Sequence, residues 1–267
     1  MANKNLPPAN LFGKTEDERG VDPGTGRPFD CDDYELSEEI TRTFSMGERI
    51  HHNPLASERD VADFRLEGSA KIHFPEGRMR LENVVDPSEG DLANFVLWGG
   101  VELPDNVCIR WNFYPIREPG LAILFFAARG HGGKDVLNAS LKPRNGGYPE
   151  YHSSDLDAFH VAYFRRKHPP VRAFHTCNLR KSAGFQLVAQ AADPLPEVGD
   201  AFPPYRMTVV KSGPEVWFAI NHLLLFRWVD DGSHGPVLGG GRFAFRQMAP
   251  LIAEYSDLEV RRVKPRS

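Results

Sequence analysis

Short runs of alternating or continuous apolar residues follow one another from Leu66 onward, and Gly, Pro, Asp and Asn separate them. Runs of strand length with turn residues between them are typical of antiparallel β-sandwiches. The pattern predicts thirteen strands, at residues 69–74, 78–85, 93–99, 106–114, 120–128, 158–166, 172–178, 184–190, 205–211, 215–221, 223–229, 241–248 and 252–262. We therefore expect an all-β protein in which two antiparallel sheets pack face to face.

Successive residues of a strand point to opposite faces, so alternation separates core positions from outer ones. One alternating set in residues 107–113 is large and apolar and is expected in the core: Val107, Ile109, Trp111 and Phe113. In residues 159–166 the outer set is the more polar one: His160, Ala162, Phe164 and Arg166. The sequence thus predicts a single polar sheet face, lined by Arg110, Asn112, His160 and Arg166.

The first 50 residues lack this pattern, because prolines and an Asp-Pro-Gly turn interrupt any periodicity. Only residues 34–44 are expected to form a short helix. No linker or internal repeat follows Asn53, so we expect one sandwich domain over residues 51–267 with an irregular N-terminal arm at 1–50. The few apolar residues of the arm should anchor it across the sandwich surface, and deletion of residues 1–45 should leave the sandwich folded.

Composition excludes several classes of protein. The 267 residues are 41% hydrophobic and 25% charged, which does not fit a disordered, collagen-like or coiled-coil chain. No apolar run approaches the roughly 18 residues of a membrane helix, and no secretory signal pattern is visible at the N-terminus. We therefore expect a soluble cytoplasmic protein that has no membrane partner. The three cysteines lie far apart without a CxxC pair, which excludes a disulfide framework and a cysteine zinc site.

The charge is unevenly distributed along the chain. Residues 1–50 hold 11 acidic and 6 basic side chains, whereas residues 148–181 hold six Lys or Arg, three acids and four of the ten His. A local cationic field of this kind favours an anionic ligand. Nucleic acid is not the expected anion, because the pI is about 6.2 and no nucleic-acid-binding signature is present.

Five strings carry a resemblance to a known family: Tyr148-Pro149-Glu150-Tyr151-His152, Tyr163-Phe164-Arg165-Arg166, Cys177-Asn178-Leu179-Arg180-Lys181, Asp230-Asp231-Gly232 and Phe245-Arg246-Gln247-Met248-Ala249-Pro250. Together they resemble the bacterial YesU-like family, a domain-of-unknown-function family, over residues 53–260. The resemblance implies a concanavalin A-like, galectin-like jelly roll whose ligands lie across a concave sheet. It also implies a link to the use of pectic, rhamnogalacturonan-type polysaccharides. The expected partner is therefore an acidic oligosaccharide, which the protein either processes or, as a noncatalytic lectin-like protein, only binds.

Elimination or dehydration at a uronate, by a lyase or dehydratase, is the chemistry that the residues favour. Glycoside hydrolysis needs two carboxylates across the scissile bond, and the Glu-x-Asp-x-x-Glu string of concanavalin-like glucanases is missing. Elimination instead needs a neutralised carboxylate, a base and an acid, which Arg, His and Tyr can supply without a cofactor. The candidate catalytic residues are His152, His160, Tyr151 and Tyr163. The candidate substrate-binding residues are Arg110, Asn112, Glu150, Arg166, Arg172, Asn178, Arg180 and Arg246.

Some alternatives stay open at this stage. Tyr163 alternates with Val161 and could belong to the core, and a hydrolase would turn to Glu150, Asp155 and Asp157 as acids. No metal site is predicted, since the two acids of Asp230-Asp231-Gly232 do not by themselves make a calcium site. A homodimer, or an assembly role for the acidic arm, is a further alternative.

Overall fold

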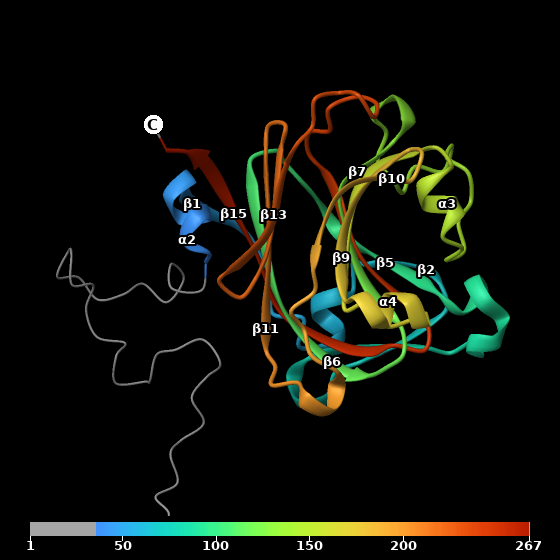
Figure 1. The fold of residues 1–267 in the computed structure, drawn as a ribbon. Helices are drawn as coiled ribbons and strands as arrows, with labels where there is room; N and C mark the ends of the chain where they lie inside the picture. Colours follow the sequence, from blue (N-terminus) through green and yellow to red (C-terminus); the bar gives the residue numbers. More distant parts are fainter. Residues whose placement is uncertain (1–35, 267) are drawn as a thin grey trace, which may run out of the picture.

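A computed structural model describes residues 36–266 as two antiparallel sheets packed face to face (Figure 1). The eight-stranded sheet has the order β13 (Leu223–Val229), β12 (Glu215–Ile220), β11 (Tyr205–Ser212), β6 (Val107–Arg117), β15 (Ile252–Pro265), β4 (Met79–Asn83) and β3 (Ala70–His73), and β1 (Phe44–Asn53) also pairs with β15. The seven-stranded sheet has the order β10 (Gln186–Ala192), β9 (Thr176–Ser182), β8 (Leu156–Tyr163), β7 (Leu121–Gly130), β14 (Gly241–Met248), β5 (Phe95–Leu103) and β2 (Arg65–Gly68). The predicted two-sheet antiparallel sandwich is confirmed.

Helices occupy little of the described chain. The α-helices are α2 (Glu38–Thr43), α3 (Pro149–His152) and α4 (Pro169–Phe174). Short 3-10 turns are η2 (Glu58–Val61), η3 (Pro75–Gly77), η4 (Pro87–Ala93), η5 (His131–Gly133) and η6 (Val198–Asp200). Within residues 36–266 no helix is long and apolar enough to cross a membrane.

The main core lies between the two sheets, where alternation places the large apolar side chains. The set predicted for β6 is buried there, and its Trp111 ring packs against Tyr163 of β8 and Phe245 of β14. Aromatic contacts of this kind join strands of both sheets across the interface. The core occupies the inner face of each sheet, so a binding site has to lie on the outer face of a sheet or at its edge.

Three parts of the chain differ from the expected strand pattern. β1 and β2 were not predicted, and β1 crosses the boundary at residue 50 that the sequence suggested. The strand expected at 172–178 is wrong in its first half, because α4 begins on Pro169-Pro170 and ends at His175, whose backbone is left-handed with φ 43°. Proline suits the first turn of a helix, and a left-handed residue stops it.

The outer face of the eight-stranded sheet is covered by the segment that precedes β1. Ile40 of α2 and the adjoining Phe44 are buried there, and the Phe44 ring meets Trp217 edge-on at 5.4 Å. The helix expected within 34–44 thus exists, and it packs on the sandwich. The apolar residues of 1–35 that were expected to anchor the arm lie outside the described residues.

The outer face of the seven-stranded sheet is covered by residues 131–155, which join β7 to β8 and include α3 (Figure 1). We call this segment the strap. Val136 and Tyr151 of the strap are buried in a second apolar cluster with Trp98 and Phe125 of the sheet. The strap therefore encloses the side chains that point outward from β5, β7, β8 and β14.

Candidate functional site

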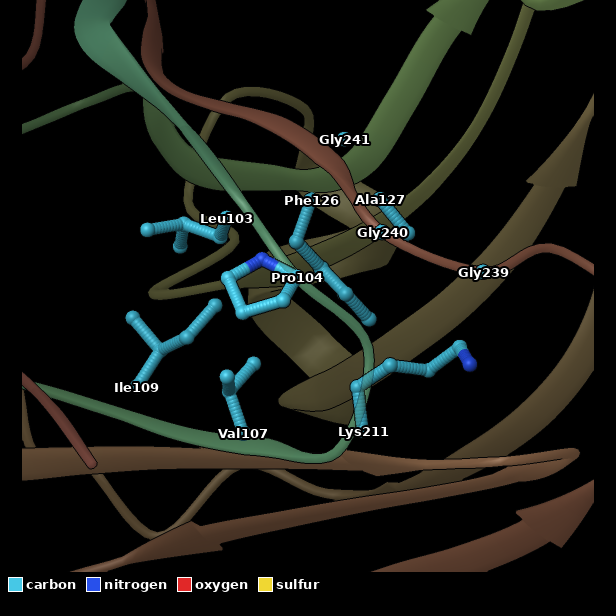
Figure 2. Close-up of a pocket in the computed structure, with 10 residues that line it drawn as sticks. All are labelled: Leu103, Pro104, Val107, Ile109, Phe126, Ala127, Lys211, Gly239, Gly240 and Gly241. Carbon is cyan, nitrogen blue, oxygen red and sulfur yellow. The ribbon is translucent and has the colours of Figure 1, made fainter. Parts of the chain in front are cut away.

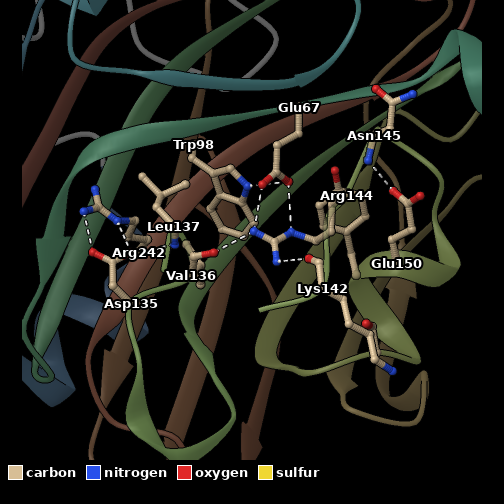
Figure 3. A network of polar contacts seen from close by, with 12 residues as sticks. Glu67, Trp98, Asp135, Val136, Leu137, Lys142, Arg144, Asn145, Glu150 and Arg242 are labelled. Atoms are coloured by element: carbon tan, nitrogen blue, oxygen red, sulfur yellow. Dashed lines mark hydrogen bonds and ion pairs between the residues drawn. The ribbon is translucent and has the colours of Figure 1, made fainter. Parts of the chain in front are cut away.

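An ion pair between Arg144 of the strap and Glu67 of β2 anchors the strap to the sheet (Figure 3). Arg144 Nη2 lies 2.7 Å from Glu67 Oε1, and Arg144 Nε lies 3.1 Å from Oε2. The Trp98 indole also donates to Oε2, at 2.9 Å, while Arg144 Nη2 donates to the Val136 carbonyl at 2.6 Å. A bidentate pair of this kind fixes direction as well as distance.

A second ion pair anchors the beginning of the strap (Figure 3). Arg242 of β14 donates from Nε and Nη2 to the two oxygens of Asp135, at 2.8 and 2.6 Å. Hydrogen bonds from this guanidinium lower the pKa of Asp135 to about 2. The same carboxylate accepts from the Leu137 backbone, so it also shapes the turn that follows.

Between these anchors and the edge strand β10, three guanidinium groups gather on the covered face. They belong to Arg165, Arg180 and Arg246, and none of them makes an ion pair with a carboxylate among residues 36–266. Arg180 donates to the Phe185 carbonyl and stacks on the Phe185 ring at 3.9 Å. Arg165 donates to the Thr176 carbonyl. The face therefore carries positive charge that no described carboxylate contacts in an ion pair, although Asp91 and Glu150 oppose the charge of Arg246 from a greater distance.

Arg246 lies deepest of the three and is fully buried. Its guanidinium donates from Nη1 to the Gly146 carbonyl at 2.7 Å and contacts the rings of Tyr148 and Tyr151, at 4.6 and 5.5 Å. Nε and Nη2 have no partner among the described residues. These two nitrogens form the edge of a guanidinium that holds a carboxylate in bidentate fashion.

His160 is also fully buried on this face, and neither ring nitrogen has a hydrogen-bond partner among residues 36–266. Its neighbours are the rings of Phe125, Tyr148 and Phe185, at 5.1, 5.7 and 6.1 Å. Burial, with the nearby charge of Arg180, lowers the pKa of His160 well below 6.5. The imidazole is therefore neutral at pH 7.

Three partly exposed rings, Tyr148, His152 and Phe185, close the face above His160. His152 lies 4.2 Å from Phe185 and 4.8 Å from Tyr148, centroid to centroid, and its carbonyl accepts from the Gly184 backbone at 2.7 Å. That hydrogen bond ties α3 of the strap to the β9–β10 hairpin. Burial, then the charges of Arg246 and Arg180, lower the pKa of His152.

Strand register explains why these groups meet. Cα pairing puts Arg246, Ile123, Ala162, Asn178 and Gln190 in one row across β14, β7, β8, β9 and β10, and the next row holds Phe125, His160 and Arg180. The small side chain of Ala162 leaves space between the larger ones beside it. The side-chain amides of Asn178 and Gln190 lie 2.7 Å apart at the far end of the row.

The structure brings together these residues among the predicted ones: His152, His160, Tyr151, Asn178, Arg180 and Arg246. Glu150 is also on the strap, but it accepts from the backbone of Asn145 and Gly147, at 2.6 and 3.1 Å, and so caps a turn. The Tyr151 hydroxyl accepts from the Gly146 backbone at 3.1 Å, and burial raises its pKa. Tyr151 thus has a structural partner.

Other predicted residues lie elsewhere, and the single face expected for Arg110, Asn112, His160 and Arg166 is wrong. Arg110 and Asn112 do point outward, but from β6 of the eight-stranded sheet, on the opposite side of the sandwich from His160. Arg172 is exposed on α4. Alternation assigns faces within a strand, and it does not say which sheet the strand joins.

Arg166 does not lie on the expected face, because strand β8 ends at Tyr163 and the alternation of side chains between the two faces ends there too. Phe164 has a positive φ of 47° and turns into the core. Arg166 is consequently buried, with Nη2 donating to the Leu195 carbonyl at 2.6 Å and Nη1 lying 3.5 Å from the buried Asp193 carboxylate. Burial raises the pKa of Asp193 although Arg166 opposes that change.

Tyr163, predicted as an acid, lies in the core between the sheets. Its hydroxyl accepts from the Trp111 indole at 3.3 Å, and burial raises its pKa well above 10. The alternation with Val161 already pointed to this outcome.

The sequence did not single out three residues of this face as binding or catalytic: Tyr148, Arg165 and Phe185. Tyr148 and Arg165 do lie in the family-like strings, but Tyr148 is in a connection, and alternation put Arg165 on the core side of the strand expected at 158–166. Phe185 is in the β9–β10 turn, whereas the sequence pattern placed it in the strand expected at 184–190. Their common signal is an aromatic or Arg residue in a connection beside a polar strand face.

Two further features, the Asp230-Asp231 pair and a small cavity beside Lys211, do not form a ligand-binding site. Asp230 is buried against the Lys181 ammonium at 2.8 Å, and Asp231 accepts from the Ser233 backbone. Within the described range no group of three or more His, Cys, Asp or Glu is arranged to hold a metal ion. A small cavity beside Lys211 and the Gly239–Gly241 turn is lined mainly by apolar side chains and backbone, with about 10 Å³ for the centre of a water molecule (Figure 2), which is room for one water.

Comparison with known proteins places the chain in a family. The family model described as a domain of unknown function, DUF1961, matches residues 48–260. The chain belongs to the DUF1961 family. Within that family it is 49% identical over 218 residues to the uncharacterized protein YesU of Bacillus subtilis (strain 168), over 81% of this chain and 97% of that protein. The predicted YesU-like resemblance is confirmed.

Solved structures agree on the fold. A protein of unknown function with a galectin-like fold from Bacillus subtilis is similar with a TM-score of 0.81 and 48% identity, over 84% of this chain and 100% of that one. An endo-β-1,3-glucanase from Pyrococcus furiosus is similar with a TM-score of 0.55 and 12% identity, over 82% and 95% of the two chains. At such low identity the second likeness concerns the fold alone.

The buried neutral His160 predicts a pH dependence of stability. Its pKa is lower in the folded state than the usual 6.5, so below that pH the unfolded chain binds a proton that the folded chain does not. The free energy of unfolding should fall on acidification, by about 1.4 kcal/mol per pH unit for one group. His160→Gln should remove this contribution. Between pH 7.5 and 5.5 the free energy of unfolding, measured with urea, should therefore fall by about 1 kcal/mol less in the variant than in wild type. Parallel pH profiles of the two proteins would contradict it.

The Arg166–Asp193 pair predicts a structural role for Arg166. Arg166→Ala leaves a buried carboxylate without its partner, which should lower the free energy of unfolding by about 3–5 kcal/mol. Arg172→Ala, a change of the same kind on exposed α4, should alter it by less than about 0.5 kcal/mol. Thermal and urea unfolding measure both, and an equally small effect of the two changes would show that Arg166 is not needed for stability.

Proposed function

We propose that the covered face of the seven-stranded sheet binds an acidic oligosaccharide. The observation that carries this proposal is the cluster of Arg165, Arg180 and Arg246, which has no carboxylate partner among residues 36–266. Buried cations are normally paired. A ligand that supplies the missing negative charge would therefore be held strongly, and a planar carboxylate suits guanidinium groups best.

The surroundings of the arginines favour a sugar over other anions. Tyr148, His152 and Phe185 offer ring faces and edges, while Asn178 and Gln190 offer amide groups for hydroxyls. Proteins named as an endo-β-1,3-glucanase, a laminarinase and a carbohydrate recognition domain share the sandwich fold. We infer that the carboxylate belongs to a uronate, of the kind found in pectin-derived, rhamnogalacturonan-type oligosaccharides.

Elimination at that uronate is the reaction that the same residues would support. Arginine charge beside the carboxylate acidifies the adjacent C5 proton. His152 is partly exposed and has a lowered pKa, so that it is neutral and able to accept a proton at pH 7. The two tyrosines first considered as acids, Tyr151 and Tyr163, have structural partners, and the acid has to be a different group.

Binding is tested at Arg180, which is partly exposed on the covered face. Arg180→Ala should weaken binding of a galacturonate-containing oligosaccharide about tenfold to hundredfold, because one charged hydrogen bond contributes about 1.5–3 kcal/mol. Titration calorimetry at two salt concentrations measures the loss, and wild-type affinity should fall at higher salt. Arg172→Ala is the matched control. Equal affinities of wild type and Arg180→Ala would contradict the proposal, as would equal binding of a neutral galactan.

Elimination is tested with oligogalacturonides and rhamnogalacturonan oligosaccharides, by following the ultraviolet absorbance of a new C4=C5 double bond. The rate should rise with pH through the pKa of His152, which lies below 6.5, and level off near neutrality, because only neutral imidazole accepts the proton. His152→Ala should reduce turnover about 10²- to 10⁴-fold. A product that has gained water without a double bond would indicate hydrolysis, and binding without any product would indicate a noncatalytic lectin-like protein.

A further inference from the structure

Tyr148 occupies the centre of the covered face. Its ring lies 4.6 Å from the Arg246 guanidinium and 5.7 Å from the His160 ring, and it meets His152 and Phe185 edge-on at 4.8 and 5.3 Å. Arg246, His160, His152 and Phe185 are thus arranged around one phenol ring. The Tyr148 hydroxyl makes no hydrogen bond with any residue of the described part of the chain.

We propose that Tyr148 is the catalytic acid of the elimination, an inference that rests on the proposed function. The other tyrosines of this region are committed elsewhere, since Tyr151 is held by the Gly146 backbone and Tyr163 lies between the sheets. Tyr148 is only partly exposed, adjoins the base His152, and lies on the strap with its ring against the Arg246 guanidinium.

The reaction balances with these two groups. His152 takes the C5 proton, and the electrons of the C5–H bond form the C4=C5 double bond. The C4–O bond breaks at the same time, and its oxygen takes the phenol proton of Tyr148 to leave as a hydroxyl. Tyrosinate and imidazolium then exchange a proton through solvent, which restores both side chains.

The environment of the Tyr148 phenol keeps its proton in place before the reaction and stabilises the tyrosinate after the proton is donated. Burial raises the pKa of Tyr148 to about 12, so the proton to be donated is present at neutral pH. The guanidinium groups of Arg246, Arg180 and Arg165 act in the opposite direction and stabilise the tyrosinate that forms. An isolated buried phenol would have the first property without the second.

Tyr148→Phe tests the inference, because it keeps the ring that stacks on Arg246 and removes the donated proton. Turnover of an oligogalacturonide should fall about 10²- to 10⁴-fold, while its affinity by calorimetry should change by less than about tenfold. On a uronate with 4-nitrophenolate at C4, which leaves without a proton, the variant should lose less than about tenfold. Tyr114→Phe, on the other sheet, is the matched control and should behave as wild type.

Two results would overturn the role of Tyr148 alone: unchanged turnover of the oligogalacturonide, or an equal loss on both substrates, which marks a structural effect. If wild-type protein binds the oligogalacturonide but forms no double bond, elimination and this role fall together, and the binding proposal stands. If wild type does not bind either, the proposed function fails as well.

Discussion

The Arg144–Glu67 ion pair is the contact on which the candidate site depends, because it holds the strap on the sheet that the strap covers. Glu67 lies on edge strand β2, and its carboxylate accepts from both Arg144 and the Trp98 indole of β5. One carboxylate thus joins the strap, the edge and the interior of the sheet. A satisfied and largely buried pair of this kind adds little net stability, but loss of either partner leaves a charge without compensation. Its contribution is to fix a single position for the strap.

That position turns an open sheet face into a closed, positively charged one. With the strap in place, Arg246 lies beneath the rings of Tyr148 and Tyr151 and loses contact with solvent. Cation–π contacts and the Gly146 carbonyl offset part of the cost of burying the guanidinium. They do not neutralise its charge, which also lowers the pKa of His152. The strap therefore leaves buried guanidinium groups that a negatively charged ligand would stabilise. On an open face, water around each guanidinium would stabilise the charge instead.

Alternation along the strands was enough to predict the sandwich, the core side of β6 and the outward position of His160. It failed where the outcome depends on contacts between distant segments. Arg110 and His160 both point outward, yet they lie on opposite sheets, because strand order is set by pairing across the whole chain. A single left-handed residue, Phe164, reversed the face expected for Arg166. Tyr148 could not be assigned at all, since a loop has no periodicity to interpret.

The cationic window shows why charge in a sequence differs from charge in a site. Two of its basic residues, Arg166 and Lys181, are neutralised by Asp193 and Asp230, which follow 27 and 49 residues later. Arg172 stays in solvent, and the deepest guanidinium of the site, Arg246, comes from outside the window. Only the basic side chains that have no acidic partner in the folded protein can bind an anionic ligand. A local count of Lys and Arg in the sequence can locate the region, but the fold is needed to identify which side chains these are.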